Sequence, residues 1–307
     1  MRVLFMGTPE FALPSLEALC RESEVVGIVS QPDRPKGRGQ RLSPPPVAEA
    51  ARERGIPLLQ PQRLKDPEVV SWVQERKPDL ITVVAYGRII PPEIFQLPPL
   101  GTINVHPSLL PRHRGPSPIP FAILCGDTET GVTIMYLSEE MDAGDILLQQ
   151  RIPIDPEDTA RTLEEKLAQL GARALLEAIA LIREGKAPRI PQDPAKATTT
   201  RKLVKEDGRI DWTRPGEWIC RLVRAMDPWP TAYTFRGGDL LKIWRATPEP
   251  GLMGRPGEVV AVGQESIVVA AGEGGGRVLE VQPAGRRRMT MEEFLRGYRV
   301  QRGEVWM

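Results

Sequence analysis

Two short apolar runs, Leu80-Ile81-Thr82-Val83-Val84-Ala85 and Gly101-Thr102-Ile103-Asn104-Val105, decide the fold class. Both are rich in β-branched residues and too short for a buried helix, so each predicts a strand. Similar runs precede them, separated by helical patterns, at Val3–Met6, Glu24–Ser30 and Pro57–Gln60. Strands that alternate with helices predict an α/β fold: an open, mostly parallel, Rossmann-like sheet with helices on both faces.

The rest of the chain completes this sheet and then predicts a second, smaller domain. Gly131–Leu137 and Ile146–Ile154 predict a hairpin that completes the sheet, and Thr159–Arg183 predicts an amphipathic helix on it. A polar segment rich in proline and threonine follows, and it is typical of a linker. Short β-like runs between Ala232 and Val281, separated by glycine turns, predict a small OB-like β-barrel. We expect domains at 1–188 and 207–307, with a linker at 189–206.

The turn after the first strand argues against dinucleotide binding. Gly7-Thr8-Pro9-Glu10 has one glycine of a G-x-G-x-x-G pattern, and Pro9 removes a backbone amide that a pyrophosphate would need. The chain has no P-loop motif either. This turn predicts a helix start, with Thr8 as the N-cap and Pro9 at the first helical position.

The overall composition narrows the function classes further. There are 41 basic and 40 acidic residues, so no global charge excess indicates DNA binding. Three widely separated cysteines disfavour both a disulfide framework and a metal site. No apolar run approaches the ~18 residues of a membrane span, and the start is not a signal peptide. We expect a soluble, cytoplasmic, monomeric protein without membrane contact.

Rare residues gather in one segment. The only asparagine, Asn104, and the only two histidines, His106 and His113, lie close together in the sequence. Strand alternation places Asn104 and His106 on one side, where an amide can stabilise an oxyanion and an imidazole can transfer a proton. Asp142 lies in a later turn, from which a carboxylate can orient His106, although spacing gives no distance. The alternative is that both histidines are structural, which is the commoner role for a lone histidine.

A basic segment follows the second predicted strand. Four cations, Arg34, Lys36, Arg38 and Arg41, stand among prolines and glycines, so this segment cannot be core. One interpretation is a loop that closes on phosphates, and the other is a solvated surface loop. Residues 201–307 carry 18 basic and 14 acidic residues, a weak excess that is compatible with RNA contact.

Several of these motifs together resemble the 10-formyltetrahydrofolate-dependent formyltransferase family. The similarity runs along the whole chain and is most specific in the N-x-H-x-S-L-L-P-x-x-R-G segment that begins at Asn104 and in the later D-x-G-D at Asp142. It implies that Asn104, His106 and Asp142 are catalytic. His113 stands where relatives usually carry tryptophan or tyrosine.

The resemblance also implies the substrates. It places folate contacts on the following residues: Ser108, Leu109, Leu110, Pro111, Val84, Ala85 and Tyr86. It places tRNA contacts on Arg34, Lys36, Arg38 and Arg41, and a tRNA-binding role on the β-barrel. The implied reaction moves a formyl group from 10-formyltetrahydrofolate, without a metal, to the α-amine of methionine on initiator tRNA. The alternatives are a formyltransferase for an amino sugar or nucleotide, and a non-catalytic RNA-binding protein on the same scaffold.

Overall fold

The computed structural model describes residues 1–36 and 41–307, and the side chains of residues 1–35 and 42–307. The chain forms two compact units. The first comprises Met1–Pro118, Glu129–Pro153 and Glu164–Arg201, and the second comprises Ile119–Thr128, Ile154–Leu163 and Lys202–Met307. Residues 189–201, which we expected to be part of a linker, therefore belong to the first unit.

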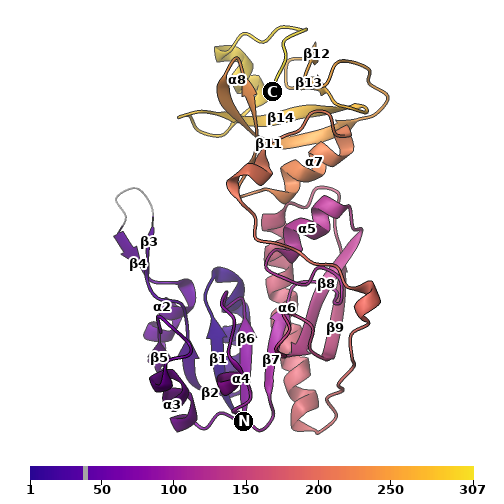
Figure 1. Cartoon of the computed structure of the whole chain (residues 1–307). Coiled ribbons are helices and arrows are strands. Elements are labelled where there is room, and N and C mark those ends of the chain that lie inside the picture. Colours follow the sequence, from indigo (N-terminus) through magenta and orange to yellow (C-terminus); the bar gives the residue numbers. More distant parts are fainter. Residues whose placement is uncertain (37–40) are drawn as a thin grey trace. The chain divides into compact units, whose positions relative to one another are not determined.

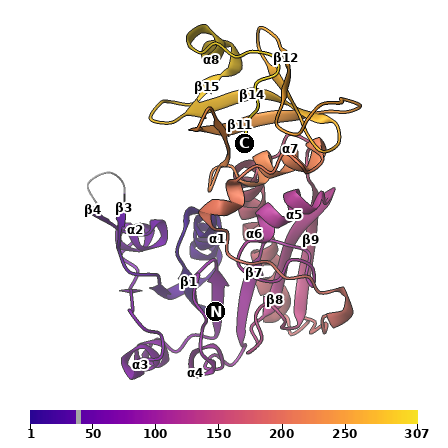
Figure 2. The same ribbon diagram turned by 45° about the horizontal axis from the view of Figure 1, so that its top comes forward.

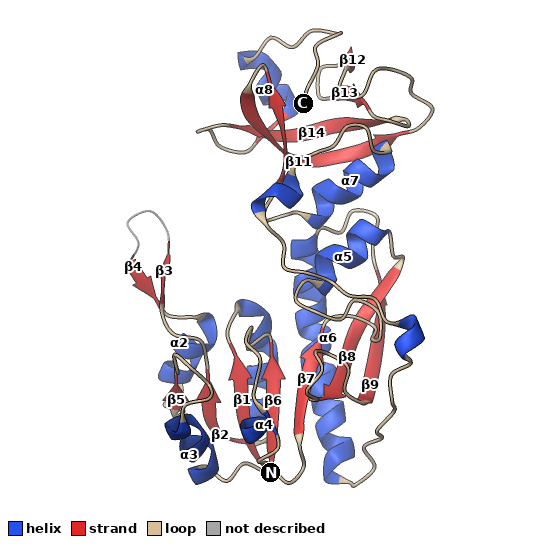
Figure 3. Cartoon of the chain, viewed as in Figure 1, coloured by secondary structure: helices blue, strands red, loops and turns tan. Residues whose placement is uncertain are grey.

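The first unit is built on a seven-stranded, mostly parallel sheet (Figures 1 and 3). In spatial order its strands are β5 (Leu58–Leu59), β2 (Glu24–Val29), β1 (Arg2–Gly7), β6 (Leu80–Val84), β7 (Thr102–His106), β8 (Glu129–Tyr136) and β9 (Ile146–Pro153). The first five run parallel to one another. The strand β8 runs antiparallel to both of its neighbours, β7 and β9, and forms the expected hairpin with β9. The predicted α/β class is confirmed.

Burial explains why the central strands are apolar. All five residues of β6 are buried, as is usual for a parallel strand covered on both faces. Burying each of its valine, leucine or isoleucine side chains contributes roughly 1.5–3 kcal/mol. The strands β6 and β7 pair in register from Ile81↔Thr102 to Val84↔Val105. Their carboxyl ends therefore meet at one edge of the sheet, which is where open α/β sheets bind ligands.

Helices connect these strands. In chain order they are α1 (Leu13–Glu22), α2 (Pro46–Glu53), α3 (Pro67–Glu75), α4 (Pro92–Phe95), α5 (Pro118–Cys125) and α6 (Ala160–Arg183). On α6, a Cβ added at Gly171 would lie 2.9 Å from Val105 Cγ1, so the helix packs closely on β7. None of the helices in the described residues has both the length and the apolar composition needed to cross a membrane.

The expected role of Thr8 is wrong. A short 3-10 helix, Glu10–Ala12, precedes α1, and its N-cap is Pro9 without a side-chain hydrogen bond. The Thr8 hydroxyl instead donates to the Tyr86 carbonyl oxygen over 3.0 Å. This hydrogen bond connects the turns that follow β1 and β6.

The second unit is mainly an antiparallel sheet (Figure 2). Its strands, in spatial order, are β10 (Ala232–Arg236), β11 (Asp239–Glu249), β14 (Gly275–Pro283), β13 (Ile267–Ala270) and β12 (Val259–Val262), and β15 (Met289–Thr290) pairs with β14. The helix α7 (Gly216–Ala225) packs against β11 and β14, and α8 (Met291–Gly297) follows β15. Both edge strands, β10 and β12, hydrogen-bond the C-terminal residues of the chain. Met307 exchanges backbone hydrogen bonds with Phe235, and Val259 N donates to Glu304 O over 2.7 Å. A closed barrel stays a prediction.

Candidate functional site

The centre of the site is the carboxyl end of β7. Asn104 and His106 are two residues apart on this strand, so both side chains project from the same face. Asn104 pairs with Val83 of β6 on one side and with Met135 of β8 on the other, and His106 pairs with Thr133. His106 is 4% exposed, whereas Asn104 is partly exposed.

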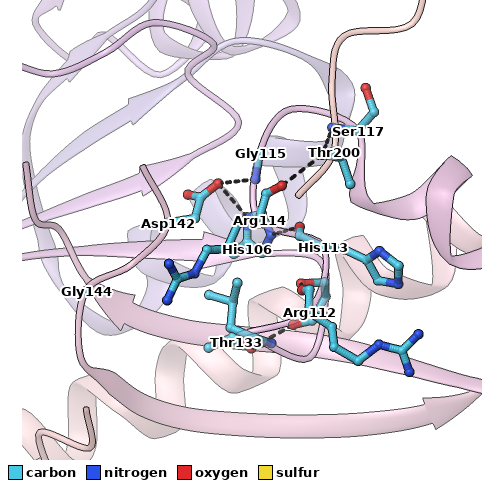
Figure 4. A network of polar contacts seen from close by, with 12 residues as sticks. His106, Arg112, His113, Arg114, Gly115, Ser117, Thr133, Asp142, Gly144 and Thr200 are labelled. Carbon is cyan, nitrogen blue, oxygen red and sulfur yellow. Dashed lines mark hydrogen bonds and ion pairs between the residues drawn. The ribbon is translucent and has the colours of Figure 1, made fainter. Parts of the chain in front are cut away.

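The imidazole of His106 is held by backbone. Its Nε2 lies 3.0 Å from the His113 carbonyl oxygen, which can only accept a hydrogen bond, so Nε2 carries a proton and donates (Figure 4). The other ring nitrogen, Nδ1, lies 3.7 Å from Asp142 Oδ2. This distance exceeds hydrogen-bond range but brings the predicted pair together. Because Nε2 is engaged, Nδ1 is the ring atom that can gain or lose a proton.

The Asp142 carboxylate is held by the backbone of the loop that follows β7. Its Oδ2 accepts a hydrogen bond of 2.8 Å from Gly115 N, and its side chain is 15% exposed. Both Asp142 (φ 53°) and His113 (φ 57°) have left-handed backbones, which are costly for residues other than glycine. Strain of this kind, of order 1–3 kcal/mol per residue, persists only where surrounding contacts enforce it, and it concentrates at functional sites.

The predicted folate segment Ser108–Pro111 is a loop that is hydrogen-bonded to side chains of β8 and β9. Thr133 Oγ1 donates to Ser108 O over 2.7 Å and accepts from Leu110 N over 3.1 Å. Gln149 Nε2 donates to Leu110 O over 2.8 Å. Ser108 is fully buried and its hydroxyl donates to Arg112 O, so this side chain shapes the loop itself. Leu109 and Pro111 are partly exposed.

The second predicted folate segment, Val84–Tyr86, lies at the end of the neighbouring strand. Val84 is buried in the sheet, while Ala85 is exposed and has a φ of 47°. The Tyr86 ring is 1% exposed and packs in the apolar core with residues such as Leu4 and Ile94. Burial raises the pKa of the Tyr86 hydroxyl to about 12. Contacts from this segment to a ligand would therefore come from Ala85 and from main-chain groups.

The basic segment forms a two-stranded hairpin of β3 (Arg34–Lys36) and β4 (Arg41–Ser43). Arg34 is exposed, and its Nη2 donates to Gln31 Oε1 over 2.5 Å. Gln31 Nε2 in turn donates to Tyr86 O over 2.7 Å. The predicted contact Arg38 lies outside the described residues, and for Lys36 and Arg41 only the backbone is described. The base of this hairpin is thus connected to the end of β6.

The second unit contains a cavity of about 310 Å³ lined by four arginines. Three of them form ion pairs with carboxylates of the same unit: Arg221 with Glu217, Arg245 with Glu157, and Arg288 with Glu280. The fourth, Arg224, donates to Asp158 O, and burial lowers its pKa. Three of the four cavity arginines are therefore ion-paired, which reduces the positive charge of the cavity.

The geometry agrees with the comparison to known families. Residues 1–179 match the family described as "Formyl transferase", and residues 202–299 match "Formyl transferase, C-terminal domain". The chain belongs to the formyl transferase family.

Related proteins match over the full length of this formyl transferase. It is 50% identical to "Methionyl-tRNA formyltransferase" of Symbiobacterium thermophilum, over 99% of this chain and 94% of that one. It is 46% identical to the protein of the same name in Moorella thermoacetica, over 99% of each chain. Among solved structures, HypX from Aquifex aeolicus in complex with tetrahydrofolic acid shares the fold at 23% identity and a TM-score of 0.63; the match covers 99% of this chain and 51% of HypX.

Within residues 1–36 and 41–307, no group of three or more His, Cys, Asp or Glu side chains could hold a metal ion. None of the three cysteines, Cys20, Cys125 and Cys220, forms a disulfide in the part of the chain that the structure describes.

Sequence reasoning missed a set of residues around the candidate site. Gln192, Thr198 and Thr200 lie in the segment that we expected to be a linker, yet they hydrogen-bond the loop after β7. Thr198 Oγ1 accepts from His113 N over 2.8 Å, and Thr200 N donates to Arg114 O over 2.7 Å. Polar, proline-rich composition hides such contacts, and the only available signal was the run of three threonines at 198–200.

Proposed function

We propose that this protein transfers the formyl group of 10-formyltetrahydrofolate to the α-amino group of methionine esterified to initiator tRNA, as part of translation initiation. The observation that carries the proposal is the 50% identity to a methionyl-tRNA formyltransferase, which extends over both units. Further proteins of this name have 44–47% identity over nearly the whole chain.

We propose that Asn104, His106 and Asp142 carry the chemistry. The neutral amine attacks the formyl carbon, and the carbonyl oxygen becomes an oxyanion. The Asn104 amide and His106, protonated at Nδ1, stabilise that oxyanion, while Asp142 stabilises the charged imidazole. When the intermediate collapses, the bond between carbon and N10 breaks, N10 gains a proton, and the amine nitrogen loses one. The 3.7 Å separation of His106 Nδ1 and Asp142 Oδ2 supports this assignment.

The residues at the sheet edge fit a folate donor. A pterin offers an edge of ring amide and amine groups, which main-chain atoms can recognise. Ala85 is exposed at the end of β6, and Leu109 and Pro111 are partly exposed in the loop after β7. The remaining members of the set, Val84, Tyr86, Ser108 and Leu110, are buried, so we assign them to shaping this edge.

We propose that tRNA is bound by the basic hairpin and the second unit. Arg34 is exposed, and the hairpin base reaches the end of β6 through Gln31. For Lys36, Arg38 and Arg41 the proposal rests on the sequence. We propose formyl transfer in 1–188 and tRNA binding in 207–307; residues 189–201 of the expected linker at 189–206 belong to the first unit.

One assay tests the proposed function. Purified protein is incubated with 10-formyltetrahydrofolate and, in turn, with charged initiator methionyl-tRNA, uncharged tRNA, and small amino sugars or nucleotides. We expect formylation of the charged tRNA alone. Formylation of a small amine in preference to the tRNA would contradict the proposal, and so would tRNA binding without turnover.

A further inference from the structure

Gln192 contacts the turn that carries Asp142. Its side-chain Nε2 donates two hydrogen bonds, to the carbonyl oxygens of Asp142 and Gly144, each over 2.8 Å. Gln192 is partly buried and lies well after β9 in the sequence, in the segment that we expected to be a linker. It belongs to the same compact unit as Asp142.

Arg114 fixes the orientation of the Gln192 amide. The Arg114 Nε and Nη2 atoms both donate to Gln192 Oε1, over 3.0 and 2.9 Å. Because a guanidinium only donates, the amide oxygen must face Arg114 and the NH2 group must face the Asp142 turn. The Arg114 side chain is 10% exposed, and its Nη1 also contacts Glu140. The donor pair on Gln192 is therefore preorganised.

The Asp142 turn needs such a restraint. Asp142 has a φ of 53°, and a Cβ added at Gly144 would lie 1.8 Å from Tyr136 O, so the turn is both strained and tightly packed. Gly115 N holds the carboxylate, whereas Gln192 holds the two carbonyl oxygens. The carboxylate and the backbone of Asp142 are thus fixed by separate groups.

We infer that Gln192 is a positioning residue for the formyl transfer, acting through Asp142. Its amide holds the Asp142 turn so that the carboxylate faces His106 Nδ1. The inference rests on the proposed function, since it assigns Gln192 a role only if Asp142 takes part in the reaction.

Three variants test this role: Gln192→Ala, Gln192→Glu and the control Gln150→Ala. Gln192→Ala removes both donors and should lower kcat roughly 10- to 100-fold, the range expected for a misplaced catalytic group. The KM values for folate and tRNA should stay within about threefold, because no substrate contact is removed. Gln192→Glu still pairs with Arg114 but presents an oxygen to the two carbonyls, so kcat should fall at least as far. Gln150, whose amide donates to Glu177 on the surface, should tolerate alanine without loss.

A double-mutant cycle separates positioning from general stability. Single-turnover rates with excess enzyme are compared for Asp142→Asn with and without Gln192→Ala. If Gln192 acts through Asp142, its substitution adds little further loss in the Asp142→Asn background. Multiplied losses, near wild-type kcat in Gln192→Ala, or a Gln192→Glu protein as active as wild type would each overturn the inference. Thermal melts of both Gln192 variants check that they fold.

Failure of the proposed function has a different signature. If Asp142→Asn alone keeps near wild-type turnover, the catalytic assignment of Asp142 is wrong, and the role of Gln192 fails with it. If Asp142→Asn is impaired and Gln192→Ala is not, only the present inference fails.

Discussion

The loop after β7 and the hairpin after β2 both follow strand ends and both carry arginines, but they are held differently. Arg114 in the first is 8% exposed and bonds Gln192 and Glu140, while its backbone bonds Thr198 and Thr200. Arg34 in the second is exposed and bonds Gln31. The loop that carries the proposed chemistry is thus fastened at many points. The hairpin presents Arg34 at the surface, as contact with a large anionic partner requires.

Substitution of the proposed catalytic residues beside the loop after β7 should have the largest effect. Asn104→Ala removes an oxyanion donor, and Asp142→Ala removes the carboxylate that stabilises the charged imidazole of His106. Each should lower kcat by at least about 10²–10³, the range typical for the loss of one oxyanion donor. Circular dichroism should show folded proteins. Near wild-type turnover in either variant would contradict the catalytic assignment.

Loosening the loop without touching the catalytic groups should have a smaller effect. Thr133→Val keeps the side-chain shape but removes the hydroxyl that bonds Ser108 O, Leu110 N and Gln149 Nε2. Gln149 Nε2 keeps its hydrogen bond to Leu110 O, but Ser108 O and Leu110 N lose their partner, which should cost about 1–3 kcal/mol of unfolding free energy. The KM for folate should rise more than the KM for tRNA. An unchanged denaturant midpoint would show that the loop does not depend on Thr133.

Substitution in the basic segment, residues 34–41, should change tRNA use alone. Arg38→Ala and Arg34→Ala should each weaken tRNA use and reduce the slope of log K against log salt by about one, while the folate KM stays constant. Arg21→Ala, on α1, removes the same charge elsewhere and serves as the control. A change in folate affinity without a change in tRNA affinity would contradict the role given to the hairpin.

The smallest effect on stability at neutral pH is expected at Tyr86, which follows β6 and contacts Gln31 at the base of the hairpin. Its buried hydroxyl has no hydrogen-bond partner among the described residues, so Tyr86→Phe should leave the Tm at pH 7 equal or higher. The folded state keeps the Tyr86 proton up to about pH 12, whereas the unfolded chain loses it near pH 10. Ionisation of Tyr86 therefore leaves the free energy of unfolding unchanged below pH 10 and lowers it between pH 10 and pH 12. Denaturation across that range should show a weaker pH dependence for Tyr86→Phe, and a lower Tm at pH 7 would reveal an unseen partner.

Much of the fold follows from the sequence because short apolar runs fix buried strands. The predicted strands Val3–Met6 and Glu24–Ser30 match β1 and β2 to within one residue at each end, and the hairpin of β8 and β9 was expected. The helix α5 was missed because its first three residues include two prolines. The helices α7 and α8 were missed because the surrounding strands dominated the pattern.

The candidate site was predictable only where chemistry selects a residue type. Asn104, His106 and Asp142 were proposed from their side chains, and the structure places His106 beside Asp142. The role of His113 was not predictable, because its carbonyl oxygen rather than its ring holds His106. Gln192 was missed for a related reason: its contacts are to main-chain oxygens far away in sequence, which leave no mark in a spacing pattern.

The threonines at 198 and 200 have a mechanical consequence. The chain passes directly from Arg201, at the end of the first unit, to Lys202 in the second. Thr200 is hydrogen-bonded to Arg114 immediately before this crossing. The chain crosses between the two units five times, and this is the last crossing. A pull on it reaches the backbone beside His113 and Gly115, the residues that bond His106 and Asp142.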